Sequence, residues 1–260
     1  MTNRTSVVAN RVPSASVLPP AVTSGKPGFL GIVMLDTQFP RPIGDIGNPL
    51  SWPVPVHQRV LRGVWPDKVV ASAAGLRQNR VLPGFVAIVR QLERDGARAI
   101  TTSCGLLVLL QRELQAAVKV PVVTSSLLQL PTLLERDQQV GVLTISSKHL
   151  GAEHLRTAGV PRDRLRDVLV QGVDAASEFA TAILGNRDTM NLERAQADVV
   201  TAALMLKARS PQLRTVVLEC TNMPPYADAI RQATGLRVLS LADSSDCARS
   251  IAEAWVKCTT

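Results

Sequence analysis

The sequence predicts an α/β protein of two pseudosymmetric domains, each with a parallel sheet of about four strands flanked by helices. Short apolar runs alternate with helical patterns along most of the 260 residues, which is typical of parallel sheets. Landmarks also recur: Cys104 and Cys220 each follow an apolar run and lie 116 residues apart, and the run at 120–125 returns at 236–241 with the same spacing. This repeat predicts a shared site in a cleft between the domains.

Seven apolar runs have the length of buried strands rather than of helices. The run at 30–37 resembles the run at 140–147, which adds a third pair of landmarks to the repeat. The expected strands lie at residues 29–35, 98–103, 120–125, 140–146, 167–172, 215–220 and 236–241.

Helical patterns separate these runs. Apolar residues at i, i+3, i+4 and i+7 predict an amphipathic helix over 85–92. Residues 105–118 are apolar enough to form a mostly buried helix. A second amphipathic pattern covers 192–206, for which Asn191 or Thr189 is the expected N-cap.

Proline marks three further segments. Asn222 is expected to cap a helix that begins at Pro224, because proline is tolerated in a first helical turn. Residues 39–55 form a long loop rich in proline and glycine directly after the first expected strand, a position typical of a lid or a binding loop. Residues 1–27 contain no acidic residue and no periodicity, so we expect a disordered N-terminal tail.

Composition excludes several classes of function. Aromatic residues make up only 3%, which argues against stacking on nucleic acid. Three charges of the net +8 lie in the acid-free tail, and the remaining basic residues alternate with acidic ones rather than forming a stripe. The excess positive charge still favours an anionic substrate. No apolar run is long enough to span a membrane, and no signal sequence is recognisable, so we expect a cytoplasmic protein. Four cysteines without metal-site spacing suit a reducing compartment and predict no metal, and Cys247 and Cys258 are interpreted as packing residues.

Cys104 and Cys220 are the candidate catalytic residues. Each stands where an expected strand gives way to a helix, and a helix N-terminus favours the thiolate. A free thiol titrates near ~8.5, close enough to neutral pH to give or take a proton. Two thiols from two facing half-repeats suit proton removal from one face of a carbon and proton delivery to the other.

Abstraction of a proton beside a carboxylate also needs donors that stabilise the developing negative charge. Hydroxyl and amide side chains gather at the ends of the expected strands. They are Thr37, Ser103, Thr124, Ser125, Thr144, Ser146, Ser147, Thr221 and Asn222. Arg41 could bind a carboxylate from the loop at 39–55. Glu219 is expected to point away from its neighbour Cys220 along a strand and is given a structural role.

The chain resembles the aspartate/glutamate racemase superfamily, which includes hydantoin racemases, arylmalonate decarboxylases and maleate isomerases. The resemblance rests on residues 30–37, on Thr101-Thr-Ser-Cys104-Gly105 and on Glu219-Cys220-Thr221-Asn222-Met-Pro-Pro-Tyr226, and it covers about 28–258. It implies the two-domain fold, a site between the domains and no cofactor. It also implies that the C-terminal helix returns to the first domain, which would then comprise 28–130 and 243–260, with 131–242 as the second domain.

By analogy with related racemases, Asp36 would orient or deprotonate Cys104. The complete expected substrate-binding set is Asp36, Thr37, Ser103, Gly105, Thr144, Ser146, Thr221 and Asn222. The leading hypothesis is a cofactor-independent racemase or epimerase that acts on a small carboxylate, such as an amino acid or a hydantoin-like compound. A maleate-type cis–trans isomerase with a cysteine nucleophile and a non-catalytic small-molecule binding protein stay open as alternatives, as does a homo-oligomer.

Overall fold

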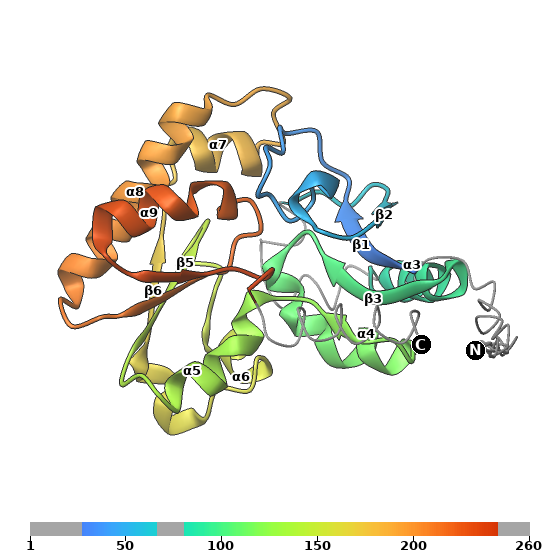
Figure 1. Ribbon diagram of the computed structural model, residues 1–260, viewed down its shortest axis with the longest axis horizontal. Coiled ribbons are helices and arrows are strands. Elements are labelled where there is room, and N and C mark those ends of the chain that lie inside the picture. The colour runs from blue at the N-terminus through green and yellow to red at the C-terminus, as the bar shows by residue number, and fades with distance from the viewer. Residues whose placement is uncertain (1–27, 67–80, 244–260) are drawn as a thin grey trace, which may run out of the picture.

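The computed structural model describes residues 28–66 and 81–243 and has two four-stranded parallel sheets (Figure 1). The strand order is β2-β1-β3-β4 in the first sheet and β6-β5-β7-β8 in the second, so the two sheets share one topology. This confirms the predicted fold class and its repeat. The strands are β1 (Phe29–Leu35), β2 (Val56–Leu61), β3 (Ala97–Thr102), β4 (Val122–Val123), β5 (Val140–Thr144), β6 (Val168–Gly172), β7 (Thr215–Leu218) and β8 (Arg237–Leu239).

Strand β2 is absent from the sequence prediction. It pairs in parallel with β1, Leu30 lying opposite Val56, and forms an edge of the sheet. The side chains of its segment Val-His-Gln-Arg-Val-Leu are mostly exposed and do not fill the core. An edge strand of this kind has no apolar run to reveal it.

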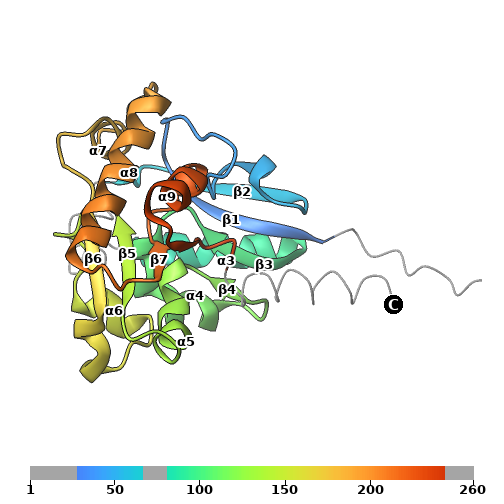
Figure 2. The same ribbon diagram turned by 60° about the vertical axis from the view of Figure 1, so that its left-hand side comes forward.

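Helices cover both faces of the second sheet (Figures 1 and 2). Helices α7 (Glu178–Leu184), α8 (Leu192–Arg209) and α9 (Ala227–Thr234) pack on one face, and α5 (Leu130–Leu134) and α6 (Ala152–Thr157) pack on the other. The predicted helix at 192–206 is α8, and the side chain of Asn191 caps it by accepting from the amide of Arg194 at 3.0 Å.

The first sheet is covered by α3 (Leu82–Asp95) and α4 (Gln111–Ala117), and α3 confirms the helix predicted over 85–92. The expected helix at 105–118 differs from the structure, since its first part, Gly105–Leu110, is a 3₁₀ segment, η2. All six residues of η2 are buried, so packing on every side shapes it rather than one amphipathic face. Leu106 and Leu109 pack in one cluster with Val140 and Val142 of β5, which joins the two halves behind Cys104.

The remaining irregular segments are also 3₁₀ turns: η1 (Pro49–Ser51), η3 (Ser126–Gln129), η4 (Arg162–Asp167) and η5 (Pro224–Tyr226). Within the described ranges, no helix is long and apolar enough to cross a membrane. The predicted tail at 1–27, the predicted C-terminal return at 244–260 and the two cysteines interpreted as packing residues, Cys247 and Cys258, lie outside the described residues.

Candidate active site

A cavity lined by residues from both halves of the chain contains both candidate cysteines. Its empty space, counted with its open mouth, is about 410 Å³. Strands β3 and β7 end at Thr102 and Leu218, so each cysteine lies just beyond the carboxyl end of a central strand, where parallel sheets bind ligands. Seven predicted site residues line the cavity: Thr37, Ser103, Cys104, Gly105, Cys220, Thr221 and Asn222.

The Cys104 thiol lies at the start of η2. Burial raises its pKa to about 12, and the charge of Glu219 adds to this rise. The nearby backbone N–H groups of Leu106 and Leu107 and the positive charge of Arg41 act in the opposite direction and lower the pKa. Cys104 therefore has three groups around it that favour the thiolate.

The Cys220 thiol has different surroundings. Its sulfur lies 3.6 Å from Oδ1 of Asn222, and Nδ2 of Asn222 donates to the carboxylate of Asp45 at 2.7 Å. Because a carboxylate only accepts, the amide must turn its oxygen toward Cys220, and the thiol must then be the donor. Burial and the charge of Glu219 raise the pKa of Cys220 well above its usual value, although the backbone N–H of Asn222 lowers it. This environment favours the protonated thiol.

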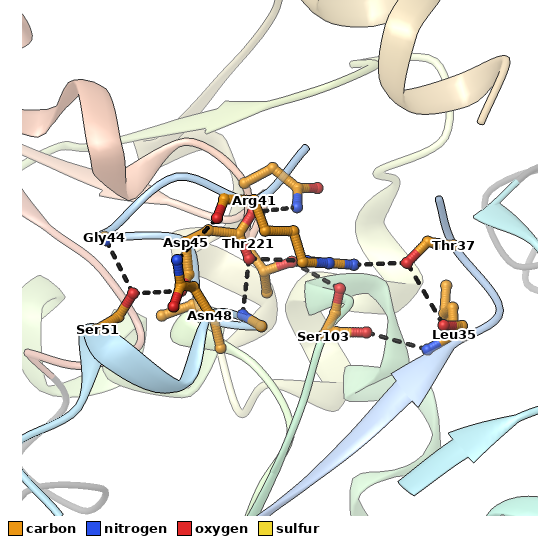
Figure 3. A network of polar contacts seen from close by, with 12 residues as sticks. Leu35, Thr37, Arg41, Gly44, Asp45, Asn48, Ser51, Ser103 and Thr221 are labelled. Atoms are coloured by element: carbon orange, nitrogen blue, oxygen red, sulfur yellow. Dashed lines mark hydrogen bonds and ion pairs between the residues drawn. The ribbon is translucent and has the colours of Figure 1, made fainter. Parts of the chain in front are cut away.

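Asp45 is the centre of a buried polar network, which we call the Asp45 cluster: Arg41, Asp45, Gly47 and Asn222. Figure 3 shows Arg41 beside Asp45. Arg41 and the amide of Gly47 both donate to Oδ1 of Asp45 at 2.7 Å, while Asn222 donates to Oδ2. Arg41 also donates to Thr37 at 2.9 Å. The carboxylate of the fully buried Asp45 thus accepts three hydrogen bonds.

The Asp45 cluster gives the loop at 39–55 a fixed position. The amide of Ile46 donates to the carbonyl of Thr221 at 3.1 Å, and Ile46 and Trp52 are buried. The loop, expected as a lid or binding loop, packs directly on the segment that carries Cys220. Sequence reasoning missed Asp45, although a single acid four residues after Arg41 in a loop of prolines and glycines was a usable signal.

Ser103 and Thr221 connect the two cysteine segments. The hydroxyl of Thr221 donates to the carbonyl of Ser103 at 2.7 Å, and the hydroxyl of Ser103 accepts from the amide of Leu35 at 3.1 Å. The Thr221 hydroxyl already uses its proton within the protein. The Ser103 hydroxyl keeps its proton for another acceptor.

Glu219 also lines the cavity, which the sequence analysis did not foresee. Strand β7 ends at Leu218, so the alternation that would turn Glu219 away from Cys220 does not extend to it. The side chain is 2% exposed, and Thr144 donates to its Oε2 at 2.7 Å. Burial raises the pKa of Glu219 to about 7, although the Thr144 hydrogen bond opposes the shift.

Gly105 provides the space that Glu219 occupies. A Cβ atom at Gly105 would lie 2.2 Å from the carbonyl oxygen of Glu219 and 2.5 Å from its Oε1. Any side chain at this position would displace the segment before Cys220. Gly105 was predicted to belong to the site, and its contribution is the absence of a side chain next to Glu219.

Three predicted site residues lie away from the cavity lining. The Asp36 carboxylate accepts from the amide of Gly63 at 2.9 Å and from Arg62 at 3.0 Å, and these contacts lower its pKa. Thr144 instead supports Glu219, and Ser146 accepts at its carbonyl from the amide of His149. The expected contact of Asp36 with Cys104 is not made.

Asn222 does not cap a helix as expected. The 3₁₀ turn that follows has Met223 at its N-cap, and the Asn222 side chain is used by Cys220 and Asp45. In the part of the chain that the structure describes, no group of three or more His, Cys, Asp or Glu side chains is arranged to hold a metal ion.

Comparison with known proteins gives a consistent relationship. The sequence profile of the Asp/Glu/hydantoin racemase family matches residues 66–245, which include both cysteines. The fold is similar to that of glutamate racemase from Francisella tularensis subsp. tularensis SCHU S4, solved in complex with D-glutamate. The TM-score is 0.54 at 13% identity, and the match covers 88% of this chain and 81% of the racemase.

Two curated relatives are lyases. Dimethylsulfoniopropionate lyase from Durusdinium sp. clade D is 30% identical over 228 residues, which cover 85% of this chain and 74% of that protein. Dimethylsulfoniopropionate lyase 3 from Emiliania huxleyi (strain CCMP1516) is 29% identical over 232 residues, 85% of this chain and 58% of the relative. The chain thus spans about three quarters of the first relative and less than two thirds of the second.

Proposed function

This chain belongs to the Asp/Glu/hydantoin racemase family, and from this premise we propose that it is a cysteine-dependent lyase that cleaves dimethylsulfoniopropionate. The observation that carries the proposal is the 30% identity to a dimethylsulfoniopropionate lyase over 85% of the chain. The remaining 15% of 260 residues is about 39, fewer than the residues before Cys104 or after Cys220, so the similar region spans both cysteines.

The proposed reaction is a β-elimination. A base removes a proton from the carbon next to the carboxylate, and the electron pair of that C–H bond forms the C=C bond. The C–S bond breaks, and its electron pair leaves with the sulfur. The products are dimethyl sulfide, acrylate and one proton, which the base holds and then releases to water.

We assign Cys104 as the base. The N–H groups of Leu106 and Leu107 and the charge of Arg41 oppose the effect of burial on this thiol, so its thiolate is the more accessible of the two. Cys220 is held as a donor by Asn222 and Asp45, and it stays protonated during the elimination. The Ser103 hydroxyl has a proton available for the oxygen on which negative charge develops.

The different surroundings of the two thiols support a lyase. An elimination needs one base. Because the electron pair of the C–H bond forms the C=C bond as the leaving group departs, no second group has to return a proton to the α-carbon. A racemase needs both thiols to act in turn as acid and base. The Asp45 cluster favours only one protonation state of Cys220.

A racemase or epimerase acting on a small carboxylate is the second candidate. One observation favours it: two thiols in topologically equivalent positions line one cavity. In that reaction Cys220 would deliver a proton to the face opposite Cys104. The two proposals therefore differ in whether Cys220 delivers a proton to the substrate.

Turnover by Cys→Ser variants tests these proposals. The purified protein is incubated with dimethylsulfoniopropionate, dimethyl sulfide is measured in the headspace, and acrylate is measured by proton NMR. We expect Cys104→Ser to lower kcat/KM by about 10³-fold or more and Cys220→Ser by much less, with Cys258→Ser as the matched control. No release of dimethyl sulfide by the wild type would contradict the lyase proposal.

The same samples in deuterium oxide test the second candidate. Enantiopure amino acids and hydantoins replace dimethylsulfoniopropionate, and loss of the α-proton signal is followed. Exchange that needs Cys104 and Cys220 equally, without release of dimethyl sulfide, would identify a racemase.

A further inference from the structure

The carboxyl group of Glu219 lines the cavity with no partner of opposite charge among residues 28–66 and 81–243. Its one hydrogen-bond partner there is the neutral hydroxyl of Thr144, and its side chain is almost completely buried. An ionised carboxylate in such surroundings is costly unless a cation neutralises it. A ligand that enters the cavity can supply that cation.

The position of Glu219 relates this missing charge to the reaction. Oε1 lies against the backbone of Gly105, the residue after Cys104, and the charge of Glu219 raises the pKa of both thiols. A cation bound beside Glu219 would therefore lie within the electrostatic reach of both sulfur atoms. It would cancel the field that disfavours the Cys104 thiolate, so the correct substrate would help to form its own base.

The cavity that Glu219 lines has a polar part, with Thr37, Ser103, Thr221 and Asn222, and an aliphatic part. Leu106, Ile145, Ile183 and Leu184 line the same cavity and provide no competing hydrogen-bonding side chain. A sulfonium or quaternary ammonium group spreads its charge over its methyl groups and donates no conventional hydrogen bond. A single carboxylate in a cavity whose lining includes these four aliphatic side chains fits such a group better than it fits a hydrated metal ion.

From this placement we infer that Glu219 binds the positive group of the substrate and makes the cavity selective for carboxylates that carry an onium group. The inference rests on the proposed function for the identity of the reacting carboxylate, and it adds the residue that recognises the opposite end of the molecule. Glu219 would thereby be a specificity-determining residue, separate from Cys104, the thiol that removes the proton.

A matched pair of unreactive ligands tests the inference without turnover. 3-(Trimethylammonio)propionate and 4,4-dimethylpentanoate have the same shape, and only the first carries a positive charge. Binding of each to the wild type is measured by isothermal titration calorimetry at pH 8, where Glu219 is mostly ionised. We expect the charged ligand to bind about tenfold or more tightly than its neutral counterpart.

Glu219→Gln keeps the shape of the side chain and removes its charge. We expect this variant to bind both ligands with similar affinity and to bind the neutral ligand as the wild type does. Glu113→Gln, which alters an exposed carboxylate on α4, is the matched control and should keep the wild-type preference. If Glu219→Gln fails to fold, Glu219→Asp, which withdraws the carboxylate by one methylene, should reduce the preference.

Equal binding of the two ligands by the wild type would overturn the inference, as would a preference that survives in folded Glu219→Gln. The result is independent of the lyase assay. A preference for the charged ligand without release of dimethyl sulfide would sustain the role of Glu219 and remove the proposed reaction. Turnover of dimethylsulfoniopropionate without a preference for the charged ligand would sustain the proposed reaction and remove the role of Glu219.

Discussion

At the scale of single residues, Cys104 and Cys220 show how equivalent positions acquire different chemistry. Both follow a central strand, yet the backbone amides of η2 lower the pKa of one thiol, whereas the other thiol donates to an amide fixed by Asp45. The charge of Glu219 acts on both thiols and raises the pKa of each. Protonation of three neighbouring groups therefore determines which thiol can act as a base.

The buried carboxyl of Glu219 predicts a pH-dependent difference in stability. Its pKa is raised from 4.5 to about 7, so the fold favours the protonated form. As the pH rises from about 4.5 to about 7, the unfolded chain releases this proton before the folded chain does, and wild-type stability falls relative to Glu219→Gln. Between pH 4.5 and pH values above 7, the free energy of unfolding of the variant should therefore rise by about 3 kcal/mol relative to that of the wild type.

Urea unfolding of both proteins at pH 5 and pH 8, without ligand, measures this difference. The gap between variant and wild type should be larger at pH 8. A gap that is equal at the two pH values would mean that Glu219 is not buried as a protonated acid. Glu113→Gln, at an exposed position, should show no such trend.

At the scale of elements, the loop at 39–55 joins the two halves at the site. It leaves β1, places Asp45 against Asn222, and places Ile46 against the Thr221 carbonyl. Arg41 stacks over the ring of Phe39 at 4.5 Å, and Phe39 itself packs in the core of the second half. The loop therefore holds Cys220 in its orientation from the opposite half of the molecule.

Asp45→Asn should weaken this arrangement. The new amide has one acceptor oxygen in place of two, and its NH₂ group faces donors from Arg41, Gly47 or Asn222. We expect a loss of about 3 kcal/mol in free energy of unfolding, because a buried charge network is broken on one side. We also expect the pH profile of kcat to shift, since the Cys220 thiol loses its fixed acceptor.

Asp228→Asn is the matched control for this prediction. Asp228 forms an i,i+3 ion pair with Arg231 on the surface, where its side chain is 85% exposed. Its loss should change stability by less than about 0.5 kcal/mol. Equal effects of the two substitutions would show that the Asp45 cluster does not stabilise the site.

At the scale of the whole molecule, the two sheets meet through a few buried polar contacts at the ends of their central strands. Thr221 of the second half donates to the Ser103 carbonyl of the first, and Ser126 donates to the Leu218 carbonyl across the same junction. Leu106 and Leu109 add apolar contacts with β5. The cavity depends on this junction, because each half supplies one thiol.

Thr221→Val removes one junction hydrogen bond while nearly preserving volume. The Ser103 carbonyl would lose a buried donor, so we expect a loss of about 1–3 kcal/mol in free energy of unfolding and a lower kcat/KM. Calorimetric and chemical unfolding measure the first effect, and the release of dimethyl sulfide measures the second.

Thr201→Val provides the comparison. Thr201 donates to the Ala197 carbonyl within α8 at an exposed position, so its loss should be nearly neutral. If Thr221→Val were equally neutral, the polar junction would not hold the halves together.

Local patterns in the sequence were sufficient for the main architecture and for the two thiols. Apolar runs ending at a cysteine identify β3 and β7, and periodicity identifies α3 and α8, because burial imposes those patterns directly on the residues concerned. The edge strand β2 escaped prediction since its side chains are mostly exposed. The 3₁₀ form of η2 likewise depends on neighbours distant in sequence, whereas β4 lies within the strand predicted at 120–125.

The sequence by itself determined the fold class, the repeat and the equivalent strand-end positions of the two cysteines, because hydrophobic periodicity is a local property. Only the tertiary structure decided which polar groups surround each thiol. Asp45 reaches Asn222 across 177 positions of the chain, and the position of Glu219 requires the missing side chain of Gly105. Such long-range contacts determine pKa values and orientation, and no short sequence pattern records them.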